Sequence, residues 1–201
     1  PIIHNKQLYL FSKNDIIKLF YNALINSNYE FYNDPLKIKN PYTNIPFART
    51  HLYNMFLYIK YNSDNINSII QSFYNCNLNL NTFILKHDPE ISILNITRFV
   101  NNGCEHSIYK FIKIMLAYYN ANTCIPYHSP PLFLYTNFPR KAYITVYKDY
   151  LKLFLCSKYI SDITRSSRYL LLFNQKMARF ANNTPSFGRL FKCITKPSFT
   201  E

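Results

Sequence analysis

The 201-residue chain has only two glycines, no tryptophan and ten acidic residues. Phosphate-binding loops of the two common nucleotide-binding types need clustered glycines, so both types are excluded. No apolar run reaches the roughly 18 residues of a membrane-spanning helix, and the N-terminus lacks the charged-then-apolar pattern of a secretory signal. We therefore expect a soluble protein that is not exported and is not one of the common nucleotide enzymes.

Cysteines are few, odd in number and far apart, separated by 20 to 37 positions: Cys76, Cys104, Cys124, Cys156 and Cys193. A disulfide framework in a small secreted domain needs an even number of cysteines at closer spacing. We therefore expect reduced thiols, mostly buried as small apolar side chains, in a reducing compartment.

One group of residues has the ligand types of a zinc site, namely Cys104, His106, Cys124 and His128. A single residue separates the first two and 17 separate the middle two, which does not match the usual paired-ligand spacing. Buried thiols and surface imidazoles are the favoured interpretation. No Cys–His pair is marked by its local sequence as a nucleophile and its base.

Carboxylates are scattered along the chain, and only Asp88 and Glu90 lie close together. Pro89 between them is typical of the first turn of a helix, where acidic residues are favoured by the helix dipole. Enzymes that act on nucleic acid usually need clustered carboxylates to hold Mg²⁺, and no such cluster is present. We predict a protein without enzymatic activity, without a metal and without a cofactor.

Apolar residues recur at helical spacing through most of the chain, whereas strand-like alternation is scarce. Helices are predicted over residues 12–26, 47–61, 90–102 and 108–119, with Ser12 as the first N-cap. Ser63 is predicted to cap a further helix that contains Ile69 and Phe73, and residues 80–86 add one or two turns. The predicted fold is therefore all-α, a compact multi-helix, bundle-like domain.

Residues 120–140 form a break that is rich in proline and aromatic residues and too apolar for a solvated linker. We expect this connector to lie packed across the fold. It separates a helical N-terminal part, residues 1–139 with the connector, from a basic C-terminal helical pair with an irregular tail, residues 140–201. The two parts are expected to form one compact unit.

Positive charge is concentrated near the C-terminus. The chain carries 23 Lys and Arg against 10 Asp and Glu, and residues 140–201 alone hold 12 against 3. If residues 157–182 form one helix, five cations fall within a sector of about 80°: Lys158, Arg165, Arg168, Lys176 and Arg179. Lys141, Lys148 and Lys152 share one face of the preceding helix. We predict that these eight residues bind an anionic partner.

Several partners fit such a basic face. Like charges on one helical face repel by a few tenths of a kcal/mol per pair, which favours an external anion. Phosphates of a nucleic acid would meet the cations, and nearby Tyr and Phe would stack on unpaired bases. An alternative is a solvated face that only keeps the protein soluble. An anionic membrane surface is a further alternative, although the chain has no Trp anchor.

The segment Asn40-Pro41-Tyr42-Thr43-Asn44 is a tight-turn sequence, in which Pro41 fixes φ and Asn44 tolerates left-handed geometry. Phe47 is expected to anchor this turn against the following helix, which carries Leu52-Tyr53-Asn54. Over residues 8–61 the chain resembles a family of uncharacterised proteins from large nucleocytoplasmic DNA viruses, the mimivirus-like and algal-virus groups. The resemblance implies a viral origin and carries no catalytic assignment. The turn is expected either to pack between helices or to bind a partner.

We therefore expect a non-catalytic viral structural or interaction protein, a component of the virion, such as a minor capsid protein, or of the virus factory in the host cytoplasm. Its partners would be other viral proteins, held in part by the basic C-terminal face. The alternative is a nucleic-acid-binding protein that acts in viral transcription, translation or genome packaging on DNA or RNA.

Overall fold

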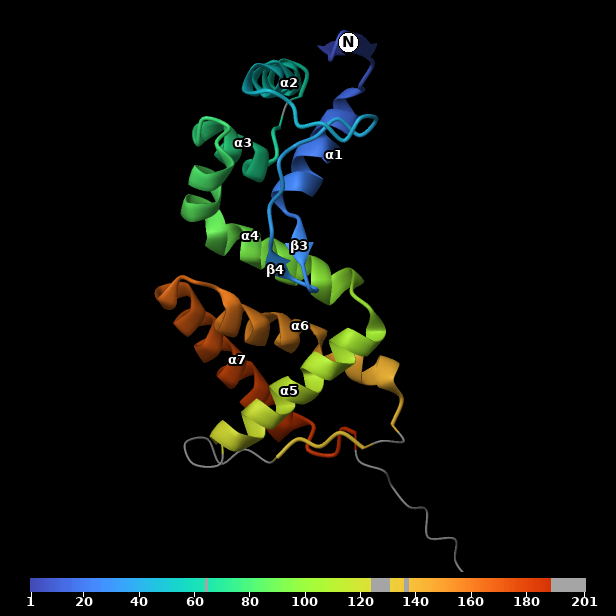
Figure 1. Cartoon of the computed structure of the whole chain (residues 1–201). Coiled ribbons are helices and arrows are strands. Elements are labelled where there is room, and N and C mark those ends of the chain that lie inside the picture. The colour runs from blue at the N-terminus through green and yellow to red at the C-terminus, as the bar shows by residue number, and fades with distance from the viewer. Residues whose placement is uncertain (64, 124–130, 136–137, 189–201) are drawn as a thin grey trace, which may run out of the picture. The chain divides into compact units, whose positions relative to one another are not determined.

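The structure is a computed structural model that describes residues 1–63, 65–123, 131–135 and 138–188. In these residues 65% of the chain is helical, which confirms the all-α fold class. The helices in chain order are α1 Lys13–Leu24, α2 Arg49–Tyr61, α3 Ser68–Asn75, α4 Leu80–Asn102, α5 Glu105–Thr123, α6 Arg140–Tyr159 and α7 Ile163–Asn183 (Figure 1). None of these helices has the length and apolar character needed to cross a membrane, as far as the described residues go.

Two small antiparallel hairpins accompany the helices, β1 Ile2–His4 with β2 Gln7–Tyr9 and β3 Ser27–Asn28 with β4 Tyr32–Asn33. The sequence did not predict them. Their turns hold pairs of residues with positive φ, Asn5 and Lys6 in the first, Tyr29 and Glu30 in the second. Turns of this kind are usually recognised by glycine, and neither turn contains one.

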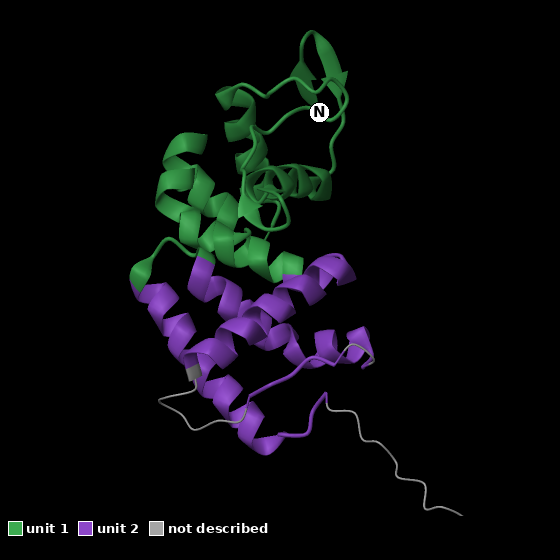
Figure 2. Ribbon diagram, turned by 60° about the horizontal axis from the view of Figure 1, so that its bottom comes forward, with its two compact units in different colours: residues 1–99, 159–163 green, residues 100–158, 164–201 purple. Residues whose placement is uncertain are grey.

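The chain divides into two compact units, coloured separately in Figure 2. Unit 1 comprises residues 1–99 and 159–163, and unit 2 comprises residues 100–158 and 164–201. This differs from the expected division at residue 139 and from the expectation of one compact unit. The reason is that α5 packs with α6 and α7, through Tyr118 against Phe154 and Tyr119 against Phe173.

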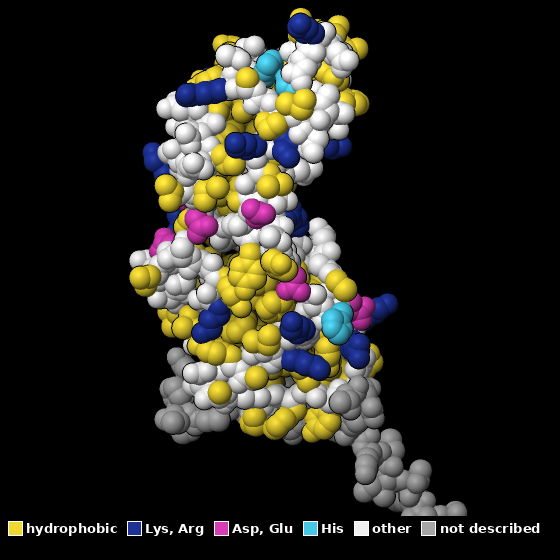
Figure 3. All heavy atoms as spheres, in the orientation of Figure 1, with side chains coloured by type: hydrophobic (Ala, Val, Ile, Leu, Met, Phe, Trp, Pro, Cys, Tyr) yellow, Lys and Arg dark blue, Asp and Glu magenta, His cyan; other side chains and the backbone are white. Residues whose placement is uncertain are grey.

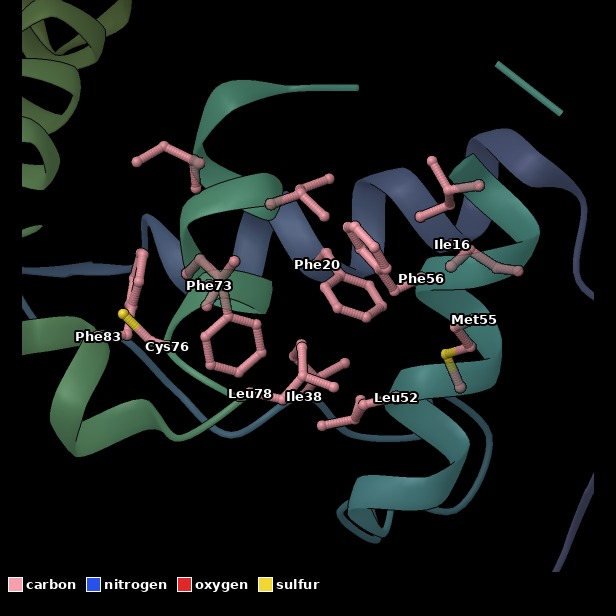
Figure 4. Packing of buried hydrophobic residues seen from close by; sticks show 14 of the residues in the cluster. Ile16, Phe20, Ile38, Leu52, Met55, Phe56, Phe73, Cys76, Leu78 and Phe83 are labelled. Carbon is pink, nitrogen blue, oxygen red and sulfur yellow. The ribbon is translucent and has the colours of Figure 1, made fainter. Parts of the chain in front are cut away.

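Unit 1 is built around a core to which α1, α2 and α3 all contribute (Figure 4). Phe20 and Phe56 are completely buried, and the Phe56 ring stacks on Tyr74 with centroids 3.9 Å apart. At the start of α1, Ser12 is the N-cap, as predicted, and it forms with Asp15 the two reciprocal bonds of a capping box. The bonds from the Ser12 hydroxyl and backbone N–H lower the pKa of the exposed Asp15 carboxyl.

The predicted cap at Ser63 is wrong, because α3 begins at Ser68. Its N-cap is Asn67, whose side-chain oxygen accepts the Ile69 backbone N–H at 3.0 Å. Farther along, α4 is kinked at His87, where φ is −121°. The kink directly precedes the Asp88–Pro89 pair that predicted a helix start, and α4 ends at Asn102, immediately before Gly103, as the sequence indicated.

Unit 2 is held together by aromatic side chains of α5, α6 and α7. On α6, Tyr147 packs on Phe180 of α7 with centroids 5.4 Å apart, and Phe154 packs on Phe173 at 5.5 Å. The described part of the connector joins this core, because Leu132 is buried and exchanges two hydrogen bonds with the Asn120 side chain. That part therefore packs on unit 2 as predicted. Residues 124–130 and 136–137 lie outside the described residues.

Candidate binding surface on the C-terminal helices

The backbone leaves helical geometry between α6 and α7, so residues 157–182 do not form one helix. In this break Ile160 is buried, and the Ser161 hydroxyl donates to the Asp88 carboxylate at 2.7 Å within unit 1. The periodic apolar pattern runs on through Ile160 and Ile163, which is why the sequence indicated a continuous helix. Lys158 therefore belongs to the last turn of α6 and is not part of a basic stripe on α7.

Lys158 is also engaged inside unit 2. Its ammonium nitrogen lies 3.8 Å from the ring centroid of Tyr118, a close cation–π contact. The same ring packs on Phe154. The charge of Lys158 therefore helps to dock α6 on α5, which makes it a poor candidate for binding an external anion.

The remaining four predicted cations of α7 do form a stripe, which we call the α7 stripe: Arg165, Arg168, Lys176 and Arg179. All four are exposed. They span about 80° around the helix and about 21 Å along it. The buried residues Phe173, Met177 and Ala181 occupy a different sector. Among the described residues, no ion pair involves Arg168, Lys176 or Arg179.

Two leucines interrupt the positive character of this surface. Helical spacing places Leu172, 36% exposed, between the cations, and Leu171, 52% exposed, at the edge of the stripe. Tyr169 lies on the other flank, where burial raises the pKa of its hydroxyl and the nearby Arg165 and Arg168 partly oppose that rise. The α7 stripe therefore combines cations with an apolar centre.

The three lysines of α6 do not extend the α7 stripe. Lys141, Lys148 and Lys152 lie about 130° around α6 from Tyr147 and Phe154, the aromatic residues that pack on α7. They therefore point away from α7. In the view of Figure 3, Lys and Arg lie in separate groups between hydrophobic side chains.

Lys141 and Lys148 instead line a hollow of about 300 Å³ between α6 and the start of α5. Glu105 lines the same hollow, so an acidic group of the protein itself faces these lysines. The eight predicted residues are thus brought together in three places: the α7 stripe, the α6 lysines beside α5, and Lys158 on Tyr118.

The candidate metal and thiol chemistry gains no support from the described residues. They contain no group of three or more metal-ligating side chains, and Cys124, His128 and Cys193 lie outside them. Of the described cysteines, Cys76 and Cys156 are buried, as expected for most of the thiols, whereas Cys104 is exposed. Burial raises the pKa of the Cys156 thiol to about 11, which keeps it protonated and unreactive at neutral pH.

Asp88 was predicted to stabilise the start of a helix, but in the structure it holds other segments of unit 1 together. Its carboxylate accepts the Asn33 side-chain N–H at 2.8 Å in addition to the Ser161 hydroxyl. Asn33 also donates to Ser92 at 2.7 Å and accepts from Asn95 at 2.9 Å. This asparagine-centred network fastens the β3–β4 hairpin to α4 inside unit 1. Sequence reasoning missed it because asparagine is abundant throughout the chain.

The Asn40–Phe47 segment forms the predicted tight turn. The Asn40 side-chain oxygen accepts the Tyr42 backbone N–H at 3.0 Å, and Asn44 adopts a left-handed φ of 58°. Phe47 is buried and packs on His51 of α2 and on His4, with centroids 6.1 and 4.9 Å away. The turn is thus anchored against the helix that follows it.

Comparisons with protein-family models, with curated proteins and with solved structures found no match to this chain.

Proposed function

We propose that the protein is a non-catalytic interaction protein that holds an acidic protein partner through the α7 stripe. In the viral setting that the resemblance of residues 8–61 implies, it would be a component of the virion or of the virus factory. The observation that carries the proposal is the α7 stripe itself. Its four cations are exposed on one side of α7, and the opposite side of the helix is buried in unit 2.

An acidic protein surface fits this arrangement better than a naked phosphate backbone. Leu171 and Leu172 expose apolar area beside and between the cations. Burying this apolar area against another protein surface stabilises the complex. A phosphate backbone offers little apolar surface for such burial. The rim cations would then steer association and fix the orientation of the partner.

Nucleic acid is the second candidate, and the charge of unit 2 favours it. Unit 2 contains 14 Lys and Arg against 3 Asp and Glu. A protein that neutralises phosphates with such residues gains affinity by releasing counterions. In this case the contacts would come from Arg168, Lys176 and Arg179.

The experiment compares two triple variants with the same change in charge. One carries Arg168→Gln, Lys176→Gln and Arg179→Gln on α7, and the matched control carries Lys141→Gln, Lys148→Gln and Lys152→Gln on α6. Binding of a fluorescent glutamate-rich helical peptide with leucines, and of oligo-dT, is measured by anisotropy at rising salt. We expect the α7 variant to bind the peptide at least about tenfold more weakly than the wild type. The α6 variant should bind it with nearly wild-type affinity.

The other outcomes are equally informative. Equal losses in both variants would mean that net charge alone attracts the probe, and the α7 stripe would be abandoned as the site. Preferential binding of oligo-dT, with a log–log salt slope of about two that falls in the α7 variant, would favour nucleic acid over an acidic protein as the partner. Absence of binding to both probes at low salt would overturn the anionic partner altogether.

A further inference from the structure

Unit 1 contains an open apolar groove with a volume of about 390 Å³. It lies between residues 36–47, the start of α2, the end of α3 and the segment that joins α3 to α4. Its main apolar lining residues are Leu36, Ile38, Phe47, Leu52, Phe73 and Leu78. Figure 4 shows Ile38, Leu52, Phe73 and Leu78 converging from these separate segments. The floor of the groove is therefore the edge of the unit 1 core.

The polar edge of this groove is entirely cationic or neutral. Lys37 and Arg49 line it, and an adjoining hollow of about 250 Å³ shares Arg49 and Asn79 and adds Lys86. Among the described residues, no Asp or Glu lines either hollow. Unit 1 as a whole is nearly balanced, with nine Lys and Arg against seven Asp and Glu, so this local excess is not a consequence of its composition.

Arg49 is held in place by its neighbour on the next turn of α2. Its Nη2 donates to the Tyr53 hydroxyl at 3.2 Å, and its guanidinium carbon lies 5.5 Å from the Tyr53 ring centroid. A guanidinium has five N–H donors in a planar fork. The contact with Tyr53 uses one donor and restrains the side chain, so the others remain oriented for a carboxylate.

Asparagine amides complete the lining. Asn79 and Asn81 border the groove, and Asn77 borders the adjoining hollow. The Asn79 side-chain oxygen accepts the Thr82 backbone N–H at 3.0 Å, which leaves its NH₂ group available. A side-chain amide offers both a donor and an acceptor, as a peptide group does, and so can pair with an extended backbone.

We propose that this groove binds an extended acidic peptide segment of a partner protein. An apolar side chain of the segment rests on the floor around Leu52 and Leu78, and its carboxylates meet Arg49 and Lys86. The asparagine amides pair with its backbone. A peptide fits because the site is open and continues into a second hollow, which suits an elongated ligand. This site lies in unit 1 and does not depend on the α7 stripe of unit 2.

The test uses the full-length protein and three synthetic peptides as probes. The first is an extended peptide with Leu-Phe flanked by Asp and Glu on both sides. The second replaces the acidic residues with Lys, and the third replaces Leu-Phe with Ser-Ser. Binding is measured by anisotropy of a fluorescein label and located by amide chemical shifts in ¹H–¹⁵N spectra.

Two double variants of equal charge change identify the site. Arg49→Glu with Lys86→Glu reverses the cationic edge, and Lys18→Glu with Lys60→Glu, at exposed positions of α1 and α2 outside both hollows, is the matched control. We expect the Arg49→Glu and Lys86→Glu variant to bind the acidic Leu-Phe peptide about tenfold more weakly than the wild type. The control variant should bind it with nearly unchanged affinity. Leu36→Ser, at the exposed edge of the groove, is expected to weaken binding of this peptide as well.

Shifts of the amides around Leu52, Leu78 and Asn79, together with loss in the Arg49 and Lys86 variant alone, would support the proposal. Equal affinity for the lysine peptide, or shifts confined to α7, would overturn it. The same shifts with inorganic phosphate alone would mean that the site binds a simple anion and not a peptide. A failed result here leaves the α7 stripe untouched, because its triple variant does not alter unit 1.

Discussion

Both units have cores of packed aromatic rings, but they differ in how they use polar and charged side chains. Unit 1 combines three short helices and most of the longer α4 with hydrogen bonds from polar side chains to backbone and to each other, as at Ser12, Asn33 and Asn40. Unit 2 consists of three long helices that meet through aromatic rings and leave most cations outside. The net charge follows this difference, +2 in unit 1 and +11 in unit 2. Networks of polar side chains that stabilise the fold are described mainly in unit 1, whereas most of the excess positive charge lies in unit 2.

The largest expected effects come from removing one core ring in each unit. Phe173→Ala removes a completely buried ring that packs on Tyr119 and Phe154, and Phe20→Ala does the same against Phe73 in unit 1. Each variant should lose about 3–5 kcal/mol of unfolding free energy. Hydrogen exchange should place the lost protection in α5–α7 for Phe173→Ala and in α1–α3 for Phe20→Ala. Loss of protection throughout the chain in both variants would mean that the units unfold together.

A smaller loss of unfolding free energy is expected when one polar contact is removed from each unit. Asn33→Ala removes the centre of the network and leaves Ser92 and Asn95 without that partner, at a cost of about 2–4 kcal/mol. Tyr143→Phe in unit 2 removes the acceptor of the Tyr135 backbone N–H and should cost about 1–2 kcal/mol. Chemical denaturation measures both, with exposed Asn22→Ala as the control. A larger loss for Tyr143→Phe would contradict the assignment of polar stabilisation to unit 1.

The smallest expected effect is a loss of stability at alkaline pH that originates mainly in unit 2. Burial raises the pKa of Cys156 to about 11 from an ordinary value of 9.0, and burial also raises the pKa values of Tyr143, Tyr147 and Tyr150. The unfolded chain therefore loses these protons first as the pH rises, so stability is complete below about pH 9 and falls above it. For Cys156 alone the loss is about 1 kcal/mol at pH 10.

Urea unfolding followed by circular dichroism at pH 7.5 and at pH 10, values about one pH unit or more to either side of the ordinary thiol pKa of 9.0, measures this effect. The Cys156→Ala variant should show a weaker pH dependence than the wild type. Tyr159→Phe, which removes a tyrosine of raised pKa from unit 1, should change the pH dependence less. The reverse order would place the alkaline sensitivity in unit 1.

Local signals in the sequence were sufficient for most helices. The Ser12 N-cap and the apolar spacing of residues 108–119 predicted α1 and α5, because capping and amphipathic periodicity act over only a few residues. The break before α7 was not predicted, since Ile160 and Ile163 continue the helical pattern through it. The predicted position of Lys158 on the α7 helix was wrong for the same reason.

The groove around Arg49 could not be found from the sequence. Its lining combines residues from 36 to 81 that come together only after α1, α2 and α3 have packed. Each cation there is isolated in the sequence, so no charge run marks the site. The four cations of the α7 stripe, by contrast, lie on one helix, and helical spacing was enough to predict that they share a face.

The short segment of residues 159–163, where α6 ends and α7 begins, limits how the molecule can be divided for expression. It belongs to unit 1, where Tyr159 packs on Phe31, although the helices on either side of it belong to unit 2 (Figure 2). Neither unit is therefore an uninterrupted stretch of polypeptide. A truncation after residue 99 would strip unit 1 of a segment that covers Phe31, and one at residue 139 would sever α5 from its helical neighbours. Expression of separate halves would require a circularly permuted or linker-bridged gene.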